Sequence, residues 1–344
     1  MELNLGGNQF SMVRFGIVGF GLHAVRRLMP GFALAQRCRV TALSSREIEK
    51  ARESGAEYGI PQAFDSTAEL CRSKEVDAVL VTTPNALHLK DVLTAIELGK
   101  PVLCEKPMAM NAGECRQMVE AARKANVLLG VAHVFRFEDS TARFRERIAG
   151  GQIGRPIFAR AEFSYQGKQH RRTWLTDPAL AGGGPIGDVG VHCVDAMRYI
   201  LQDEIVRVGA RGMWDKESGG VEAAAVLALE FERGTLGSVM VSMRADYRTP
   251  IEFVGDAGNL RADDGLTVDH PIMLELRRSG KLIETEEISN KLAYAHQVDA
   301  FADAVEGKAP FPVPAEQGWQ NQEILDAAFR SLMSGKIEDV PRVV

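Results

Sequence analysis

The chain has 344 residues, which at about 150 residues per domain predicts two domains. Its hydrophobic and charged fractions, 45% and 25%, are those of an ordinary globular protein and exclude a disordered or fibrous chain. The formal net charge of −5 argues against a nucleic-acid binder, which usually carries a basic excess. The longest stretch without a charged residue, 78–89, has 12 residues and is too short for a membrane span of about 20.

The first residues and the cysteines indicate the compartment. Residues 1–12 show no basic segment followed by an apolar core, so they do not resemble a secretory signal and are expected to form a disordered leader. The cysteines are odd in number and have no CxxC spacing, which favours reduced thiols over disulfides or structural zinc. They are Cys38, Cys71, Cys104, Cys115 and Cys193. We therefore expect a cytoplasmic protein.

Strands alternate with helices over residues 13–135. The predicted strands are 13–18, 39–43, 77–81, 102–104 and 127–132. Predicted helices follow Gly21, span 46–58, and run from Asn85 and from Asn111, with both asparagines as N-terminal caps and Pro30 ending or kinking the first helix. Since a parallel crossover is long enough for a helix, this order predicts a Rossmann domain, a doubly wound parallel sheet, over 13–135.

The pattern changes after Arg136. Short strand-like runs follow one another at 157–165, 206–213, 223–231, 235–243 and 251–255, with Glu232-Arg233-Gly234 as a hairpin connection. Helical patterns at 185–200, 292–305 and 316–333 are expected to cover one face of their sheet. Residues 136–344 therefore predict an α+β substrate-binding and oligomerisation domain with a large, mostly antiparallel open sheet. The face of this sheet that no predicted helix covers is expected to pair with other copies of the chain, in a homodimer or homotetramer.

A glycine turn follows the first predicted strand. Gly19, Phe20, Gly21 and Leu22 begin the pattern G-x-G-x-x-A, which ends at Ala24. Two residues without Cβ atoms let the backbone turn tightly and approach a pyrophosphate at the start of a helix. The alternative is a plain structural turn, but the place of the motif at the first strand-to-helix junction favours dinucleotide binding.

The end of the second strand indicates which dinucleotide. An NAD enzyme usually has an acid there, but this chain has Ser44, Ser45 and Arg46. Their hydroxyls and guanidinium suit a 2′-phosphate, which predicts NADP, with NAD as the alternative cofactor. The structural alternative is a capping serine followed by a solvated arginine.

A second glycine-rich segment carries a candidate acid-base group. Asp188, His192 and Asp195 follow a glycine run at 182–184, and their spacing of four and three residues places them on one helical face. Histidine titrates near neutral pH and is the best candidate for proton transfer. The alternative is a core histidine whose nitrogens are satisfied within the protein.

Together these segments resemble the Gfo/Idh/MocA family of glucose-fructose oxidoreductase and inositol dehydrogenase. The shared motifs are the glycine turn, the TPN-x-x-H at 83–88, the EKP at 105–107 and the GG-x-x-x-D-x-G-x-H-x-x-D that starts at Gly183. The resemblance implies an NADP-dependent oxidoreductase that transfers hydride between the nicotinamide and a secondary alcohol or carbonyl of a sugar, polyol or related cyclic alcohol. The cofactor-binding residues that it implies, beyond the glycine turn, are Thr83, Pro84, Asn85, His88, Glu105 and Lys106.

The chemistry of alcohol oxidation fits three residues of these motifs. His192 accepts or donates the hydroxyl proton, and Lys106 supplies the positive charge that stabilises an alkoxide. Asp188 holds the imidazole or touches a substrate hydroxyl. A glycoside hydrolase that uses a tightly bound nicotinamide for transient oxidation, and a catalytically silent nucleotide-sensing protein, are the alternative functions.

Further residues are expected around the substrate. His133 ends the last Rossmann strand, while Arg171, Arg172 and Trp174 precede the glycine run in a polar loop, where the indole can stack on a sugar face. For Trp174 the alternative is burial in a surface loop. No HxH or HExxH spacing occurs, so no metal site is expected.

Overall fold

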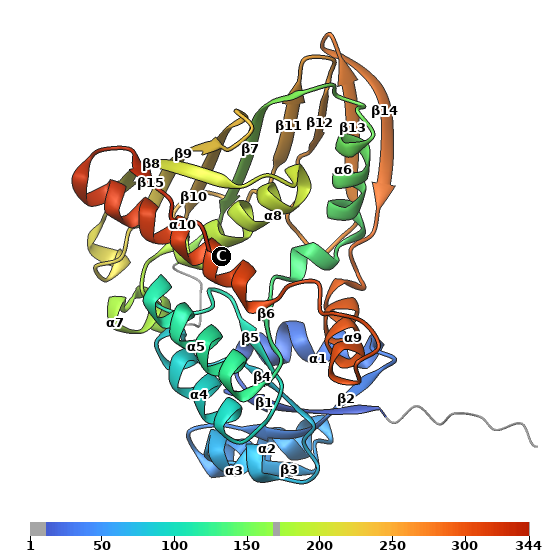
Figure 1. The fold of residues 1–344 in the computed structure, drawn as a ribbon, viewed down its shortest axis with the longest axis vertical. Helices are drawn as coiled ribbons and strands as arrows, with labels where there is room; N and C mark the ends of the chain where they lie inside the picture. Colours follow the sequence, from blue (N-terminus) through green and yellow to red (C-terminus); the bar gives the residue numbers. More distant parts are fainter. Residues whose placement is uncertain (1–11, 168–172, 344) are drawn as a thin grey trace, which may run out of the picture.

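The computed structural model describes residues 12–167 and 173–343. The first sheet is parallel, with six strands in the order β3-β2-β1-β4-β5-β6, which confirms the predicted Rossmann sheet (Figure 1). Its strands are β1 (Val13–Val18), β2 (Cys38–Ser44), β3 (Gln62–Phe64), β4 (Ala78–Val81), β5 (Val102–Glu105) and β6 (Leu129–Ala132). The central β4 is buried along its whole length, as expected for a parallel sheet covered on both faces.

The helices of this half begin with a π-helical turn. They are η1 (Ala24–Leu28), α1 (Met29–Leu34), α2 (Ile48–Tyr58), α3 (Thr67–Arg72), α4 (Asn85–Glu97) and α5 (Ala112–Ala125). The sequence did not predict β3 or α3. Pro30 does not end the first helix, because its missing N–H falls in the first turn of α1, directly after the π-helical turn.

The two asparagine caps have different outcomes. Asn111 caps α5, where its side chain accepts the Glu114 N–H, as predicted. Asn85 is not a cap: Pro84 occupies the N-cap position of α4, and the Asn85 amide donates to the carbonyl oxygen of Ala181 at 2.8 Å.

The second sheet has nine strands in the order β14-β13-β12-β11-β7-β10-β9-β8-β15. Only the β7/β10 pair is parallel, so the expected mostly antiparallel sheet is confirmed. Its strands are β7 (Pro156–Ser164), β8 (Ile205–Met213), β9 (Ala224–Phe231), β10 (Leu236–Ser242), β11 (Ile251–Gly255), β12 (Asn259–Ala262), β13 (Ile272–Arg278), β14 (Lys281–Ile288) and β15 (Glu338–Asp339). The four strands β12 to β15 were not predicted from the sequence.

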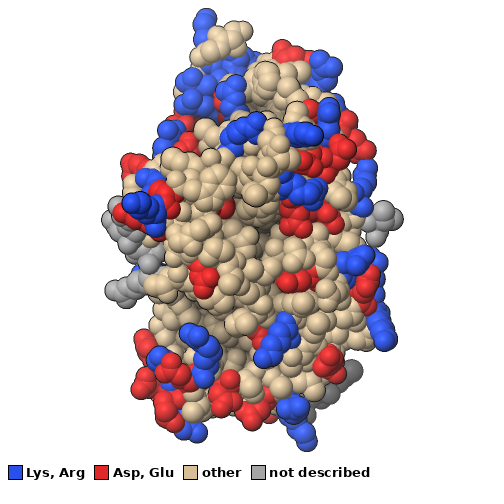
Figure 2. Space-filling model, turned by 90° about the vertical axis from the view of Figure 1, so that its left-hand side faces the viewer, with Lys and Arg blue, Asp and Glu red and all other residues tan. Residues whose placement is uncertain are grey.

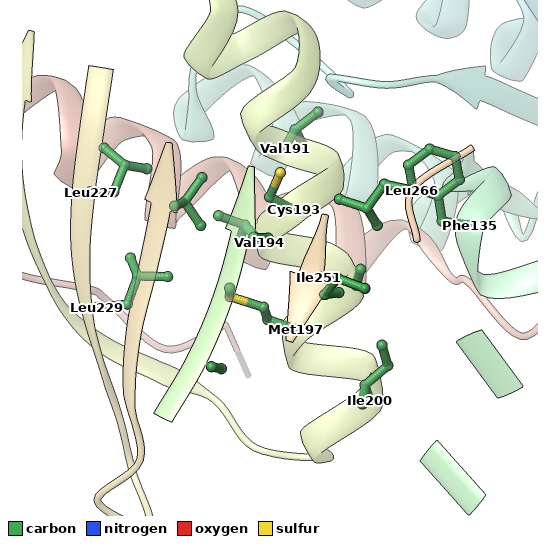
Figure 3. Packing of buried hydrophobic residues seen from close by; sticks show 14 of the residues in the cluster. Phe135, Val191, Cys193, Val194, Met197, Ile200, Leu227, Leu229, Ile251 and Leu266 are labelled. Atoms are coloured by element: carbon green, nitrogen blue, oxygen red, sulfur yellow. The ribbon is translucent and has the colours of Figure 1, made fainter. Parts of the chain in front are cut away.

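Helices cover one face of this sheet (Figure 1). They are α6 (Asp139–Ala149), α8 (Val191–Leu201) and α10 (Ala315–Ser334), and the π-helical turn η5 (Ile186–Gly190) leads directly into α8. The short helix α7 (Pro178–Ala181) packs beside α4 of the Rossmann domain instead. Figure 3 shows buried side chains of α8, among them Val194 and Met197, packed beside the sheet that carries Leu227, Leu229 and Ile251. This contact holds α8 rigidly beneath the site.

One predicted covering helix lies elsewhere. The helix α9 (Ala293–Val305) packs beside α1 on the Rossmann domain, so the expectation that 292–305 covers the second sheet is wrong. Phe301 packs in the core with Phe15, at 6.0 Å between ring centroids, and Asp299 accepts the Arg37 N–H at 2.8 Å. Its apolar face thus completes the Rossmann core.

Charge is distributed unevenly on the molecular surface. On the side shown in Figure 2, Lys and Arg lie among Asp and Glu toward both ends, and uncharged residues occupy most of the middle. Among the helices that the structure describes, none is long and apolar enough to cross a bilayer.

Candidate active site

The glycine turn lies where β1 ends, as predicted. Gly19 has a φ of +81°, and a Cβ atom there would lie 2.6 Å from Cγ2 of Thr83, so only glycine fits. The N–H groups of Gly19 and Phe20 donate to the Ser44 carbonyl oxygen, which ties the turn to the end of β2. The turn lines a groove of about 160 Å³ with loop residues that follow β4 and β5.

The residues of this groove fit a dinucleotide. The glycine turn, whose residues Gly19 and Gly21 have no Cβ atoms, forms one side of the groove, and the polar loops after β4 and β5 form the other. This arrangement suits a bound pyrophosphate. The groove is lined by Gly19, Gly21, Leu22, His23, Thr82, Thr83, Pro84, Asn85, His88, Glu105, Lys106, Pro107, Trp174 and Asp188. Phe20 was expected among them, but its ring is buried against Tyr58, and its N–H is already donated to Ser44.

Ser44 ends β2 and is followed by Ser45 and Arg46, and none of the three is among the residues that line this groove. Ser44 is buried and Ser45 half-buried, whereas Arg46 is exposed. Within the described part of the chain, the Arg46 guanidinium makes no hydrogen bond or ion pair, which leaves its donors available to a ligand.

His88 and Asn85 hold the groove walls together. The Nε2 atom of His88 lies 2.8 Å from the Thr83 carbonyl oxygen, and Nδ1 lies 3.1 Å from that of Pro107. Burial lowers the pKa of His88, so the ring is neutral and carries one N–H, which donates to one of these two carbonyl oxygens while the other nitrogen lies against the second. The Asn85 amide connects the same wall to α7 through its hydrogen bond to the Ala181 carbonyl oxygen. Both side chains line the groove, but their polar atoms contact protein carbonyl groups.

Glu105 forms a second bridge inside the groove. Its Oε1 atom lies 2.9 Å from Nε2 of His23, and Oε2 accepts the Lys106 N–H at 3.2 Å. Burial raises the pKa of Glu105, but the positive charges of His23 and Lys106 outweigh that effect and hold it below its usual value. The EKP segment is thereby fixed against the glycine turn.

Lys106 and Asp188 meet across the two domains. The Lys106 ammonium donates to the backbone carbonyl oxygen of Asp188 at 2.7 Å and lies 3.7 Å from its Oδ1 atom. The Tyr165 hydroxyl donates a hydrogen bond to Oδ2 of Asp188, at 2.7 Å between the two oxygens. Asp188 is 7% exposed, so this ion pair operates with little water around it.

The glycine run before Asp188 is packed, not loose. The buried carboxylate of Glu222 accepts the N–H groups of Gly184 and Ile186 at 2.8 and 2.9 Å. A Cβ atom at Gly184 would lie 2.1 Å from the Glu222 carbonyl oxygen. This contact sets the position from which η5 presents Asp188.

His192 is held by aromatic rings. Its ring centroid lies 4.5 Å from that of Phe135 and 6.3 Å from that of Phe163. Within the described residues neither ring nitrogen has a hydrogen-bond partner, so Asp188 does not hydrogen-bond the imidazole, and its other expected part, contact with a substrate hydroxyl, stays a prediction. Burial and the positive charge of Lys106 place the pKa of His192 well below its usual value. The ring is therefore neutral at pH 7.

His133 lies behind this wall. It is 1% exposed, its Nε2 atom is 3.0 Å from the Asn321 amide nitrogen, and its Nδ1 atom is 3.7 Å from Asp195. Asp195 in turn pairs with Arg136 at 2.7 Å. Burial lowers the pKa of His133 to about 4. The expectation that His133 contacts substrate is wrong, because its nitrogens face this buried cluster.

A larger cavity of about 290 Å³ adjoins the groove, and the residues that line both are Leu22, His23, Glu105, Lys106 and Asp188. His192, Tyr165 and Phe163 line it, while Trp174 lines the groove beside it. Sequence reasoning missed several lining residues, since a single aromatic or histidine side chain outside a motif has no recognisable spacing. They are His23, Phe135, Phe163, Tyr165, Tyr247 and Tyr294. Arg171 and Arg172 lie outside the described residues.

The structure offers no cluster of metal ligands. Among the residues it describes, no three His, Cys, Asp or Glu side chains are grouped so that they could hold an ion. The polar groups of the cavity are instead an amine, a carboxylate, a phenol and a neutral imidazole, which suit proton transfer and the binding of hydroxyl groups.

Comparison with known proteins agrees with this geometry. Residues 13–133 match the Gfo/Idh/MocA model described as an oxidoreductase family with an NAD-binding Rossmann fold, and residues 141–261 match the family's C-terminal domain. The chain is 32% identical to 1,5-anhydro-D-fructose reductase of Ensifer adhaerens, over 89% of this chain and 92% of that protein. It is 29% identical to an NADP-dependent D-xylose 1-dehydrogenase of Haloferax volcanii, over 93% and 98%.

A solved structure shows the same architecture. The aldose-aldose oxidoreductase of Caulobacter crescentus, complexed with glycerol, superimposes with a TM-score of 0.89 at 25% identity, over 95% of this chain and 99% of that one. Both halves of the chain therefore follow the family fold. With its Rossmann groove, its EKP segment and its second-domain histidine, this chain belongs to the Gfo/Idh/MocA family of NAD(P)-dependent oxidoreductases.

Proposed function

We propose that this protein transfers hydride between NADP and a secondary alcohol or carbonyl carbon of a sugar or polyol. The observation that carries the proposal is the meeting of Lys106 and Asp188, at 3.7 Å, on the wall shared by the dinucleotide groove and the cavity that His192 lines. The Ensifer adhaerens and Haloferax volcanii relatives are named for sugar substrates, which supports the substrate class.

Each side chain has a distinct part in the proposed reaction. When bound, the nicotinamide supplies or accepts the hydride. The Lys106 ammonium binds the substrate oxygen and stabilises its negative charge as the hydroxyl proton leaves. A nitrogen of the neutral His192 ring accepts that proton in oxidation and returns it in reduction. Asp188, fixed by the Tyr165 hydroxyl, keeps the ammonium aimed at the shared wall.

NADP preference follows from the end of β2. The hydroxyl groups of Ser44 and Ser45 and the exposed guanidinium of Arg46 suit a 2′-phosphate, and no acid stands at these positions to compete with it. The Haloferax volcanii relative, whose name includes NADP, supports this assignment.

Equilibrium titration tests the cofactor assignment. The purified protein is first checked for bound nucleotide and is then titrated with NADPH and NADH while tryptophan fluorescence is followed. We expect tighter binding of NADPH and a roughly tenfold loss of this preference in Arg46→Ala, since an exposed charge-assisted contact is lost. An unchanged NADPH/NADH affinity ratio in the variant contradicts the assignment.

A turnover screen with sugars and polyols tests the reaction class. Nucleotide that stays bound and does not exchange, together with cleavage of glycosides, favours a hydrolase that uses transient oxidation. Nucleotide binding without turnover of any sugar favours a silent sensing protein. We expect redox turnover with dissociable cofactor.

We also propose that the outer face of the second sheet pairs with a second copy of the chain. Phe158, Val226, Leu236 and Met240 are 41–51% exposed there, and the strand register places Leu236 beside Phe158 and Met240 beside Val226. Exposed apolar side chains that lie beside one another on a sheet favour association with a second copy. Sedimentation of the protein tests it: a dimer or tetramer is expected, and Met240→Glu should shift it toward monomer.

A further inference from the structure

The larger cavity has a buried end and an exposed end. Lys106 and His192 form the buried end, with the Lys106 side chain 11% exposed and His192 9% exposed. Arg26, on the π-helical turn η1, lines the same cavity but is exposed. Lys106 and Arg26 thus line one cavity, the first at its buried end and the second where it is exposed.

The charges that line this cavity are paired except at Arg26. Arg27 forms a two-pronged ion pair with Asp269, through Nη1 to Oδ1 and Nη2 to Oδ2. Lys106 faces Asp188, and Glu105 faces His23, as described above. Within the residues that the structure describes, the Arg26 guanidinium makes no hydrogen bond or ion pair.

The position of Arg26 favours a substrate contact over a cofactor contact. Leu22 and His23, from the same helix, line both the groove and the larger cavity, whereas Arg26 lines the larger cavity and not the groove. Arg26 lies one turn further along the helix, beside the cavity that also holds Tyr247 and Tyr294. Its five N–H donors thus face ligand space where no carboxylate of the described chain neutralises them.

We propose that the substrate carries an anionic group, a carboxylate or phosphate, and that Arg26 binds this group while Lys106 and His192 act on a hydroxyl or carbonyl at the other end. The inference rests on the proposed oxidoreductase function and narrows its substrate class to acidic sugars or sugar phosphates. A guanidinium binds either anion through two parallel hydrogen bonds, which adds orientation to affinity.

Matched substrate pairs test the inference. D-glucose is compared with D-glucuronate and with D-glucose 6-phosphate, and D-galactose with D-galacturonate, each with NADP. For at least one pair, kcat/KM should favour the anionic member roughly tenfold or more, as a charge-assisted contact predicts. The comparisons with glucuronate and galacturonate test a carboxylate, and the comparison with glucose 6-phosphate tests a phosphate, so they show which anion Arg26 binds.

Two variants separate the anion contact from a structural effect. Arg26→Gln should abolish the preference, while kcat/KM for the neutral sugar stays within about twofold and NADPH affinity is unchanged. Arg116→Gln, which removes an exposed α5 arginine paired with Glu120, should keep the preference. Raising NaCl from about 20 mM to about 500 mM should weaken the preference of the unaltered protein, because salt screens an exposed pair.

Three results overturn the inference. One is equal kcat/KM within every pair, a second is a preference that survives in Arg26→Gln, and a third is a variant that loses neutral and anionic substrates alike. If no sugar turns over although NADPH binds, the proposed function fails separately. Calorimetry of D-glucuronate binding to the NADP-loaded protein then decides the anion site, and absence of binding contradicts it.

Discussion

Two clusters of polar side chains lie around α8, a cavity cluster of Lys106, Asp188 and His192 and a rear cluster of His133, Arg136, Asp195 and Asn321. They differ in whether their nitrogen and oxygen atoms have hydrogen-bond partners within the protein. In the cavity cluster, Lys106 pairs with Asp188 at 3.7 Å, and His192 keeps both ring nitrogens free of described protein partners. Behind it, Asp195 is fully buried and is contacted by Arg136 and Asn321, both at 2.7 Å. Acids and histidines thus lie at ligand space in one cluster, where we propose that they take part in the reaction, and contact only protein in the other, where we expect them to stabilise the fold.

The largest expected effect concerns the cavity cluster. Lys106→Met should lower kcat roughly a thousandfold, because it removes the only ammonium on the wall that the described groove and cavity share. Steady-state kinetics with NADPH and the best sugar measure it, and fluorescence titration should show NADPH affinity within a few-fold of the original. Turnover at the original rate would sink the assignment of Lys106.

Substitutions in the rear cluster should lower the free energy of unfolding. Asp195→Asn leaves the Arg136 charge buried without its partner, and we expect a loss of about 3 kcal/mol in the free energy of unfolding, measured in urea. Asp188→Asn is the matched control. It should lower the free energy of unfolding less than Asp195→Asn does, because the Lys106 ammonium keeps its hydrogen bond to the backbone carbonyl oxygen of residue 188. It should strongly reduce kcat, because Lys106 loses the carboxylate that holds it on the cavity wall. A reversed pattern would refute the division between the two clusters.

Acid should destabilise the fold through the rear cluster. The folded-state pKa of His133 is lowered to about 4 by burial, while the unfolded chain takes up this proton near pH 6.5. Protons therefore favour the unfolded state as pH falls between these values, and His133 alone contributes a loss of about 3 kcal/mol by pH 4. His133→Gln should flatten the dependence of unfolding free energy on pH, and an unchanged slope contradicts the burial of a neutral ring.

The smallest effect sharpens the role of Tyr165. Tyr165→Phe removes the hydroxyl that donates to Asp188 at 2.7 Å, so kcat should fall roughly tenfold. NADPH affinity should stay unchanged, because Tyr165 lines the substrate cavity and not the groove. A rise in KM with no change in kcat would show instead that Tyr165 binds the substrate directly.

The sequence predicted those parts of the fold that follow from local patterns. Periodicity located five of the six Rossmann strands and the helices between them except α3. It missed β3, which has three half-buried residues and no apolar run. The helix α9 was predicted, but its packing against the Rossmann domain was not, because an amphipathic pattern does not indicate which sheet the apolar face of a helix covers. The strand β14 is exposed over most of its length and carries no alternating pattern.

The site was predictable where a motif fixed it. Gly19, Lys106, Asp188 and His192 all lie at the groove or cavity. Their partners were not predictable: the ring that stacks on His192 comes from Phe135, and the hydroxyl on Asp188 comes from β7-adjacent Tyr165, far apart in sequence. His133 was misassigned because the end of a strand indicates the sheet edge but not the side chain's direction.

The most direct test of the account follows the hydrogen itself. NADPH carrying deuterium at both C4 positions is incubated with the protein and a panel of sugar aldehydes and ketones, and the products are examined by mass spectrometry and NMR. The account predicts deuterium on the carbinol carbon of a product, and loss of this signal in Lys106→Met. A reduced product without deuterium, or no reduced product from any sugar while NADPH binds, contradicts hydride transfer by this site.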